Sequence, residues 1–125
     1  MTFLGDVIER LARPPQEIRA EHLRHWASSI QGTTPIGSVQ ARSRYKIAGV
    51  IQNIRIDPGQ GSGSIEATVD DGSGRIIVKW LGRQTLSGIT LGAGLVFEGI
   101  VGEGPRGNLQ VLNPEYELMP NPEHG

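Results

Sequence analysis

Residues 64–81 read SIEATVDDGSGRIIVKWL, the centre of the longer stretch, Tyr45 to Leu118, that decides the fold. Apolar and polar side chains alternate before the glycine-rich segment DDGSG and again after it. Alternation with a period of two is typical of a half-buried strand, and an Asp- and Gly-rich segment between two such runs is typical of a hairpin turn. These residues therefore predict a β-hairpin.

Three further strands are predicted around this hairpin: RYKIAGVIQNIRI at 44–56, LVFEGIVG at 95–102 and LQVLNPEYELM at 109–119. Gly49 inside the first of them indicates a β-bulge or a tight bend. Between the third and fourth strands, residues 83–89 are expected to form a short helical connector. Five strands in this order predict a mostly β protein, a five-stranded Greek-key barrel.

The same segments carry a family resemblance. KIAGVIQNIRI (46–56), EATVDDGSGRIIVKWLG (66–82), GLVFEGIVG (94–102) and NPEYEL (113–118) resemble the OB-fold family of anticodon-binding domains, helicase wedge domains and small free-standing bacterial OB proteins. DGSGRIIVKW and NPEYE are closest to RecG-type helicase wedge domains. The chain as a whole resembles the stand-alone OB-fold nucleic-acid-binding proteins of actinobacteria. The resemblance implies a barrel whose ligands lie across strands two and three.

The residues before the barrel predict two amphipathic helices. In the first, over residues 2–12, apolar side chains recur at helical spacing, and Pro14-Pro15 ends it. The second runs from about Gln16 to Ile30, with Ile18, Leu23, Trp26, Ala27 and Ile30 as its apolar positions. We expect a helical hairpin over 1–32 that packs on the barrel or on a second subunit. An extended lead-in, TTPIGSV, opens the OB domain at 33–119, and 120–125 is expected to be a flexible tail.

Composition limits the classes of protein that fit. The chain has 125 residues, 18 glycines, no cysteine and a net charge of −1. Disulfides and thiolate chemistry are therefore excluded, and the charge balance is unlike that of a strongly basic nucleic-acid binder. Apolar residues near Met1 are interrupted by charges, and no run approaches the ~20 apolar residues of a membrane span. We expect a cytoplasmic protein without a membrane partner.

Strand parity predicts a binding face. If Ile65, Val69, Val78 and Trp80 point inward, the alternate side chains of strands two and three point outward. Basic residues at the ends of the first and third strands and between the fourth and fifth would extend that face, where a single-stranded nucleic acid would contact them. The predicted nucleic-acid-binding residues are Arg55, Thr68, Arg75, Ile77, Lys79, Arg83 and Arg106.

A stacking platform for bases is missing from this prediction. The chain has only six aromatic residues, and exposed aromatics are what sequence-tolerant binders use to stack bases, at ~1–3 kcal/mol per base. Trp80 shares parity with Ile76 and Val78, and Tyr45 with Ile47, so both are expected in the core. The sequence therefore predicts a salt-sensitive, low-affinity and largely sequence-blind interaction with single-stranded or junction-like DNA or RNA.

Catalytic and metal sites are not predicted. His22 and His25 lie three residues apart on the second helix without a third convergent ligand. Asp70-Asp71 directly precedes Gly72-Ser73-Gly74, the position that a hairpin turn prefers. No serine or lysine lies beside a credible base, so we expect a non-enzymatic protein with no catalytic residues, no metal and no cofactor.

A second function remains open at this point. A nearly neutral barrel with few aromatics also fits a protein-interaction or oligomerisation module, in which the barrel or the amphipathic helices bind a partner protein or another copy of the chain. A continuous stripe of basic side chains across strands two and three favours nucleic acid. Basic side chains dispersed over all faces favour a protein partner.

Overall fold

The computed structural model describes residues 15–58, 63–82 and 86–120. Within these ranges the helices and strands are α2 (Pro15–Ser28), η1 (Ile36–Ser38), β1 (Arg44–Asp57), β2 (Ser64–Asp70), β3 (Arg75–Leu81), β4 (Gly94–Glu103), β5 (Leu109–Leu112) and β6 (Glu115–Met119). Neither of the described helices is long and apolar enough to cross a bilayer.

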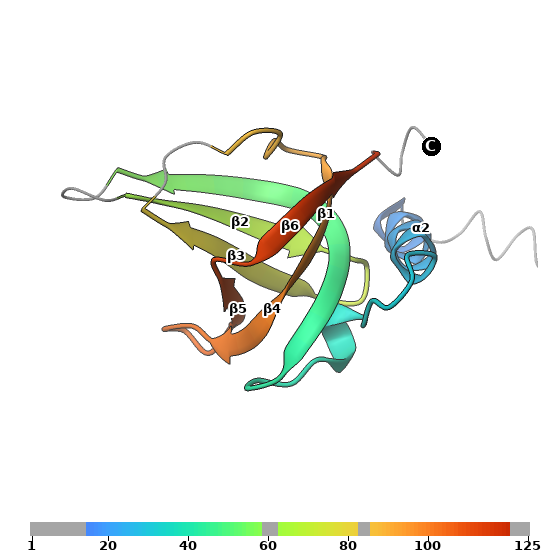
Figure 1. Cartoon of the computed structure of the whole chain (residues 1–125). Helices are drawn as coiled ribbons and strands as arrows, with labels where there is room; N and C mark the ends of the chain where they lie inside the picture. Colours follow the sequence, from blue (N-terminus) through green and yellow to red (C-terminus); the bar gives the residue numbers. More distant parts are fainter. Residues whose placement is uncertain (1–14, 59–62, 83–85, 121–125) are drawn as a thin grey trace, which may run out of the picture.

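The strands form a barrel (Figure 1). Their order in the sheet is β1-β2-β3-β5-β4-β6, and an additional β1–β4 pairing closes the ring. Among these strands, β3 and β5 form a parallel pair and the other pairs are antiparallel. β4 lies between β3 and β5 in the chain but not in the sheet, so β5 runs beside β3 in the same direction. The predicted barrel of mostly β structure is confirmed.

One barrel strand is interrupted where the sequence predicts a continuous fifth strand. Asn113 has φ +49° and Pro114 has no N–H, so the pairing breaks between β5 and β6. Asn113 bridges the gap back to β3, because its backbone N–H donates to the Lys79 carbonyl at 2.7 Å. Its side-chain Oδ1 accepts a hydrogen bond from the Leu81 N–H at 2.8 Å. The sheet therefore has six strands rather than the predicted five.

β1 pairs with two neighbouring strands. Arg44–Val50 pairs with β4, and Val50–Asp57 pairs with β2. The register with β2 shifts between Ile51 and Asn53, where one strand carries an extra residue. The sequence predicted a bulge or a tight bend at Gly49, and the bulge lies a few residues later, between Ile51 and Asn53. Gly49 is instead a point of close approach, since a Cβ there would lie 2.5 Å from Cγ1 of Val69 on β2.

The core follows the predicted alternation. All six inward positions of β2 and β3 are buried, at 4% exposure or less: Ile65, Ala67, Val69, Ile76, Val78 and Trp80. Trp80 donates its Nε1–H to the Pro114 carbonyl at 3.2 Å and meets the Tyr116 ring edge-on, with 5.3 Å between centroids. Tyr45 is half-buried against this core, and its hydroxyl accepts a hydrogen bond from the Gln40 N–H. The core role of Trp80 is confirmed, and that of Tyr45 is confirmed in part, because Tyr45 packs against the core but is only partly buried.

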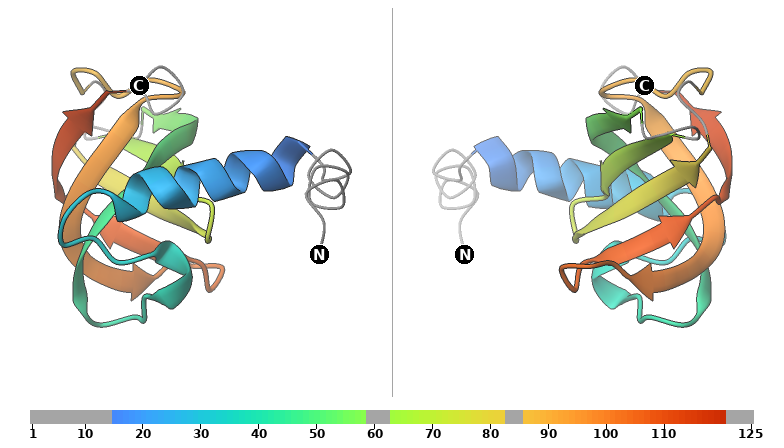
Figure 2. Two further views of the ribbon diagram at one scale, coloured as in Figure 1. Left: turned by 90° about the vertical axis from the view of Figure 1, so that its right-hand side faces the viewer. Right: turned by 90° about the vertical axis from the view of Figure 1, so that its left-hand side faces the viewer.

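Helix α2 covers the outside of the barrel at β1 and β4. Ala27 is buried against Ala48 and Val96, and Trp26 and Ile30 flank this contact. Figure 2 shows α2 on the side of the barrel away from β3 and β5. The predicted packing of the second helix on the barrel is therefore confirmed, although Ile18 does not join it and is 49% exposed.

Four local expectations need correction or lie outside the described ranges. The first predicted helix, over 2–12, and the predicted tail fall outside the described residues, so one α-helix rather than a hairpin is described before the barrel. The lead-in is not fully extended, because Ile36–Ser38 forms the 3-10 helix η1. In the connector, residues 86–89 form a turn closed by the Ile89 N–H and the Leu86 carbonyl rather than a helix, and 83–85 are not described.

Candidate nucleic-acid interface

The outward side chains of four strands stand in two rows across the barrel. Cross-strand pairing places Asn53, Thr68, Ile77 and Gln110 in one row. The next row is Arg55, Glu66, Lys79 and Leu112. Directly paired residues of neighbouring antiparallel strands have Cβ atoms about 4.5–5.5 Å apart, so side chains within a row can act on one ligand together.

All of these side chains except Leu112 form the floor of a groove of about 370 Å³. The loop from Gly104 to Asn108, between β4 and β5, adds one wall. This loop is held closed by the Gly104 N–H, which donates to the Asn108 carbonyl at 2.7 Å. The residues that line the groove are Asn53, Arg55, Asp57, Ser64, Glu66, Thr68, Ile77, Lys79, Pro105, Arg106, Asn108 and Gln110.

Five of the seven predicted binding residues come together in this groove: Arg55, Thr68, Ile77, Lys79 and Arg106. Their side chains come from β1, β2, β3 and the β4–β5 loop. The β1 bulge has a direct role here. Ile51 points into the core, so without an extra residue Arg55, four positions later, would point inward too. The register shift turns Arg55 outward, opposite Glu66.

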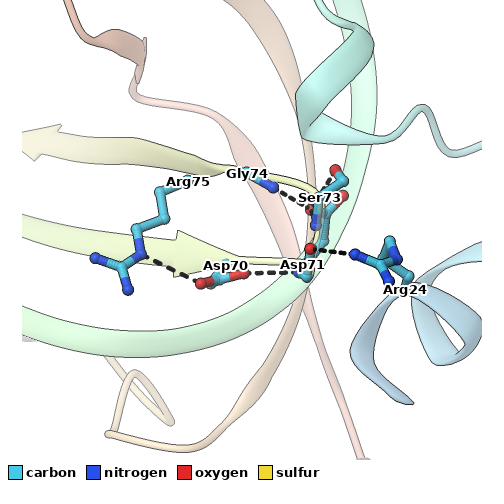
Figure 3. A network of polar contacts seen from close by, with 7 residues as sticks. Arg24, Asp70, Asp71, Ser73, Gly74 and Arg75 are labelled. Carbon is cyan, nitrogen blue, oxygen red and sulfur yellow. Dashed lines mark hydrogen bonds and ion pairs between the residues drawn. The ribbon is translucent and has the colours of Figure 1, made fainter. Parts of the chain in front are cut away.

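Arg75 does not line the groove and instead points toward Asp70 (Figure 3). Its Nε donates to Oδ2 of Asp70 at 3.2 Å, and its side chain is 70% exposed beside the β2–β3 turn. The sequence placed Arg75 on the outer face from parity alone and had no sign of this ion pair. Arg83, the remaining predicted residue, lies outside the described residues.

Several lining residues were missed by the sequence prediction. Gln110 joins the groove through the parallel β3–β5 pairing, a long-range contact with no local signature. Asn53 depends on the β1 bulge, whose position the sequence did not indicate. Glu66 was recognised as outward-facing, but its position between Arg55 and Lys79 in one row was not.

The groove is polar with a small excess of positive charge. Three basic side chains, Arg55, Lys79 and Arg106, face two acidic ones, Asp57 and Glu66. No aromatic ring stands among the described residues that line it. Phe97 is 1% exposed and belongs to the core. Such a groove can hold phosphates and hydrogen-bond to bases, and it offers no ring for stacking.

Comparison with known proteins places this architecture in a family. The family model described as "OB-fold nucleic acid binding domain" matches residues 45–119. The chain belongs to this family. In an OB fold, ligands lie across strands two and three between the loops that join strands one to two and four to five. The groove occupies this position on the OB barrel, with Arg106 on the β4–β5 loop and Asp57 at the start of the β1–β2 loop.

Solved structures with the same fold have varied ligands. A chain of RecG bound to a three-way DNA junction matches with a TM-score of 0.60 and 17% identity over 72% of this chain. An OBody bound to hen egg-white lysozyme matches with a TM-score of 0.54 and 16% identity, over 72% of this chain and 95% of its own. A replication protein A heterotrimer bound to single-stranded DNA matches with a TM-score of 0.50 and 12% identity, over 82% of this chain and 80% of the matched chain.

These likenesses establish the fold alone, because the identities are low and one barrel serves many functions. The chain covers 13% of the RecG chain that it matches, so it corresponds to a small part of that protein. A comparison with curated proteins gave no match.

Proposed function

We propose that this OB domain binds single-stranded or junction-like DNA or RNA in the groove across β2 and β3, without catalysis. The observation that carries the proposal is the convergence of Arg55, Lys79 and Arg106 from three separate elements on one groove. Such a convergence supplies several phosphate contacts along a strand, and phosphate contacts dominate the affinity of nucleic-acid complexes.

The same groove predicts low affinity and little sequence specificity. Contacts to phosphates carry no sequence information, and two carboxylates partly offset the three cations. Without an aromatic platform, the ~1–3 kcal/mol that each stacked base contributes elsewhere is missing. The complex should therefore depend strongly on salt.

A binding role without chemistry also fits the sequence. It has no cysteine, and its three histidines, His22, His25 and His124, all lie outside residues 33–119. Asp70 and Asp71 are the acidic pair that a hydrolytic enzyme would use. Both carboxylates instead accept hydrogen bonds from backbone N–H groups of the β2–β3 turn.

The test is a fluorescence anisotropy titration of the whole chain with labelled single-stranded DNA, RNA, duplex DNA and a three-way junction at two salt concentrations. We expect measurable binding at low salt with log K falling against log salt with a slope of about −2, since each of three phosphate contacts contributes ~0.7 for single strands. Arg55→Glu should weaken binding, and Arg19→Glu, on α2, should not. Undiminished binding by Arg55→Glu would place the ligand elsewhere.

A protein-binding function has one observation in its favour. Ile100 and Leu112 are 62% and 48% exposed and line a second depression of about 540 Å³ beside β4 and β5. Exposed apolar side chains that share a depression are a feature of protein interfaces. The titration distinguishes the two functions. If the chain bound none of the nucleic acids at low salt, this apolar surface would be the better candidate for the functional site.

A further inference from the structure

The centre of the groove carries a negative charge between two positive ones. Glu66 on β2 pairs in register with Arg55 on β1 and with Lys79 on β3. Glu66 is half-buried, yet among the described residues its carboxylate has neither a hydrogen bond nor an ion pair within 4 Å. Both carboxylate oxygens are therefore available to a ligand in the groove.

This arrangement of charges favours different positions in the groove for the phosphates and for the bases of a bound strand. A phosphate next to Glu66 is repelled by the carboxylate, whereas phosphates next to Arg55, Lys79 or Arg106 are attracted. The backbone of a bound strand should therefore follow the cations, and a base should face Glu66. Ile77, on β3 in the adjacent row, offers that base an apolar surface.

A carboxylate selects among the bases by its chemistry, because it only accepts hydrogen bonds. Guanine presents two adjacent donors on its Watson–Crick edge, N1–H and the N2 amino group, which match the two carboxylate oxygens. Cytosine and adenine each place a ring-nitrogen acceptor beside the amino group. Thymine and uracil flank a single N–H with two carbonyl oxygens. Guanine alone can donate a hydrogen bond to each carboxylate oxygen without placing a lone pair against either one, which makes a charge-assisted bidentate pair.

We propose that the groove prefers guanine at one position, read by Glu66. The inference rests on the proposed nucleic-acid-binding function and adds one point of base selection to an otherwise sequence-blind interaction. A good bidentate contact discriminates against the wrong base by roughly fivefold to a hundredfold in affinity.

The test compares labelled dT oligonucleotides that carry one central dG, deoxyinosine, dA or dC with the all-dT strand, by anisotropy at low salt. For the unchanged protein we expect the dG strand to bind at least about fivefold more tightly than all-dT. Deoxyinosine, which keeps N1–H and lacks the N2 amino group, should fall between them. Glu66→Gln should remove the preference and leave all-dT binding equal or stronger, because a repulsive charge is lost.

The matched control is Glu117→Gln, which makes the same chemical change on β6 and should keep the guanine preference. Equal affinity of the unchanged protein for all strands would overturn the inference while leaving the proposed function intact. A guanine preference retained in Glu66→Gln would also overturn the assignment to Glu66. If the unchanged protein bound none of the strands, the proposed function and the inference would fall together.

Discussion

Oδ2 of Asp71 accepts a hydrogen bond from the backbone N–H of Ile36 at 2.8 Å, which ties the β2–β3 turn to the 3-10 helix η1. Oδ1 of the same carboxylate accepts from the Ser73 N–H, the Ser73 hydroxyl and the Gly74 N–H within the turn (Figure 3). Asp71 is 2% exposed and its bond to the Ile36 N–H is buried, so water cannot readily replace the carboxylate there. The Asp-Asp-Gly turn therefore also connects the barrel to the segment that leads into it, through the hydrogen bond from Ile36 to Asp71.

Replacing Asp71 with Ala should destabilise the fold by about 3 kcal/mol, because the substitution leaves the buried Ile36 N–H unpaired and removes three further hydrogen bonds within the turn. Urea unfolding followed by tryptophan fluorescence measures the change. Glu117→Ala, on the exposed face of β6, is the control and should stay within about 0.5 kcal/mol of the unchanged protein. Equal unfolding midpoints for both variants would show that the Asp71 contacts do not stabilise the fold.

Trp80→Leu should affect stability far more than affinity. The substitution leaves a cavity in the core and an unpaired Pro114 carbonyl, at a cost of about 2–4 kcal/mol. Thermal unfolding gives the first quantity, and an anisotropy titration below the melting transition gives the second. A variant that kept its stability and lost binding would instead place Trp80 in contact with the ligand.

How far the sequence predicts this structure depends on the range of each interaction. The alternation in β2 and β3 is local, so it correctly predicted which side chains enter the core, Trp80 included. The break between β5 and β6 lies at Asn113, which has φ +49°, and Pro114; the prediction of one continuous strand overlooked this Asn-Pro pair. The end of helix α2 was predicted within two residues, whereas the exposure of Ile18 depends on where the barrel surface ends.

In the candidate site, too, the sequence predicted what depends on local alternation and missed what depends on long-range contacts. Parity placed Thr68, Ile77 and Lys79 outward, and the groove contains all three. Gln110 required the parallel β3–β5 pairing, which brings it beside Ile77 from a distant part of the sequence. Arg75 satisfied parity but is engaged by Asp70, a contact across the turn that competes with any ligand.

Helix α2 should contribute measurably to the stability of the barrel. Deleting residues 1–30 would expose Ala48 and Val96 to water, and we expect a melting temperature lower by about 5 °C, or a change of oligomeric state as the uncovered face finds another partner. Calorimetry and light scattering measure the two outcomes. Deleting residues 1–14 alone leaves α2 in place and is the control. An unchanged melting temperature and assembly for the longer deletion would mean that the contact is not stabilising.

Two charge reversals on β3 should show whether affinity depends on basic residues inside the groove or on those beside it. Lys79 lines the groove, whereas Arg75 is paired with Asp70 beside the β2–β3 turn. Lys79→Glu should therefore weaken binding to single-stranded DNA by about tenfold or more and reduce the slope of log K against log salt by ~0.7. Arg75→Glu should weaken it much less, and the double reversal should behave like Lys79→Glu alone. Titrations at three salt concentrations measure both quantities. Equal losses for the two single variants would extend the binding surface to the turn, and no loss for either would place the bound strand outside the groove.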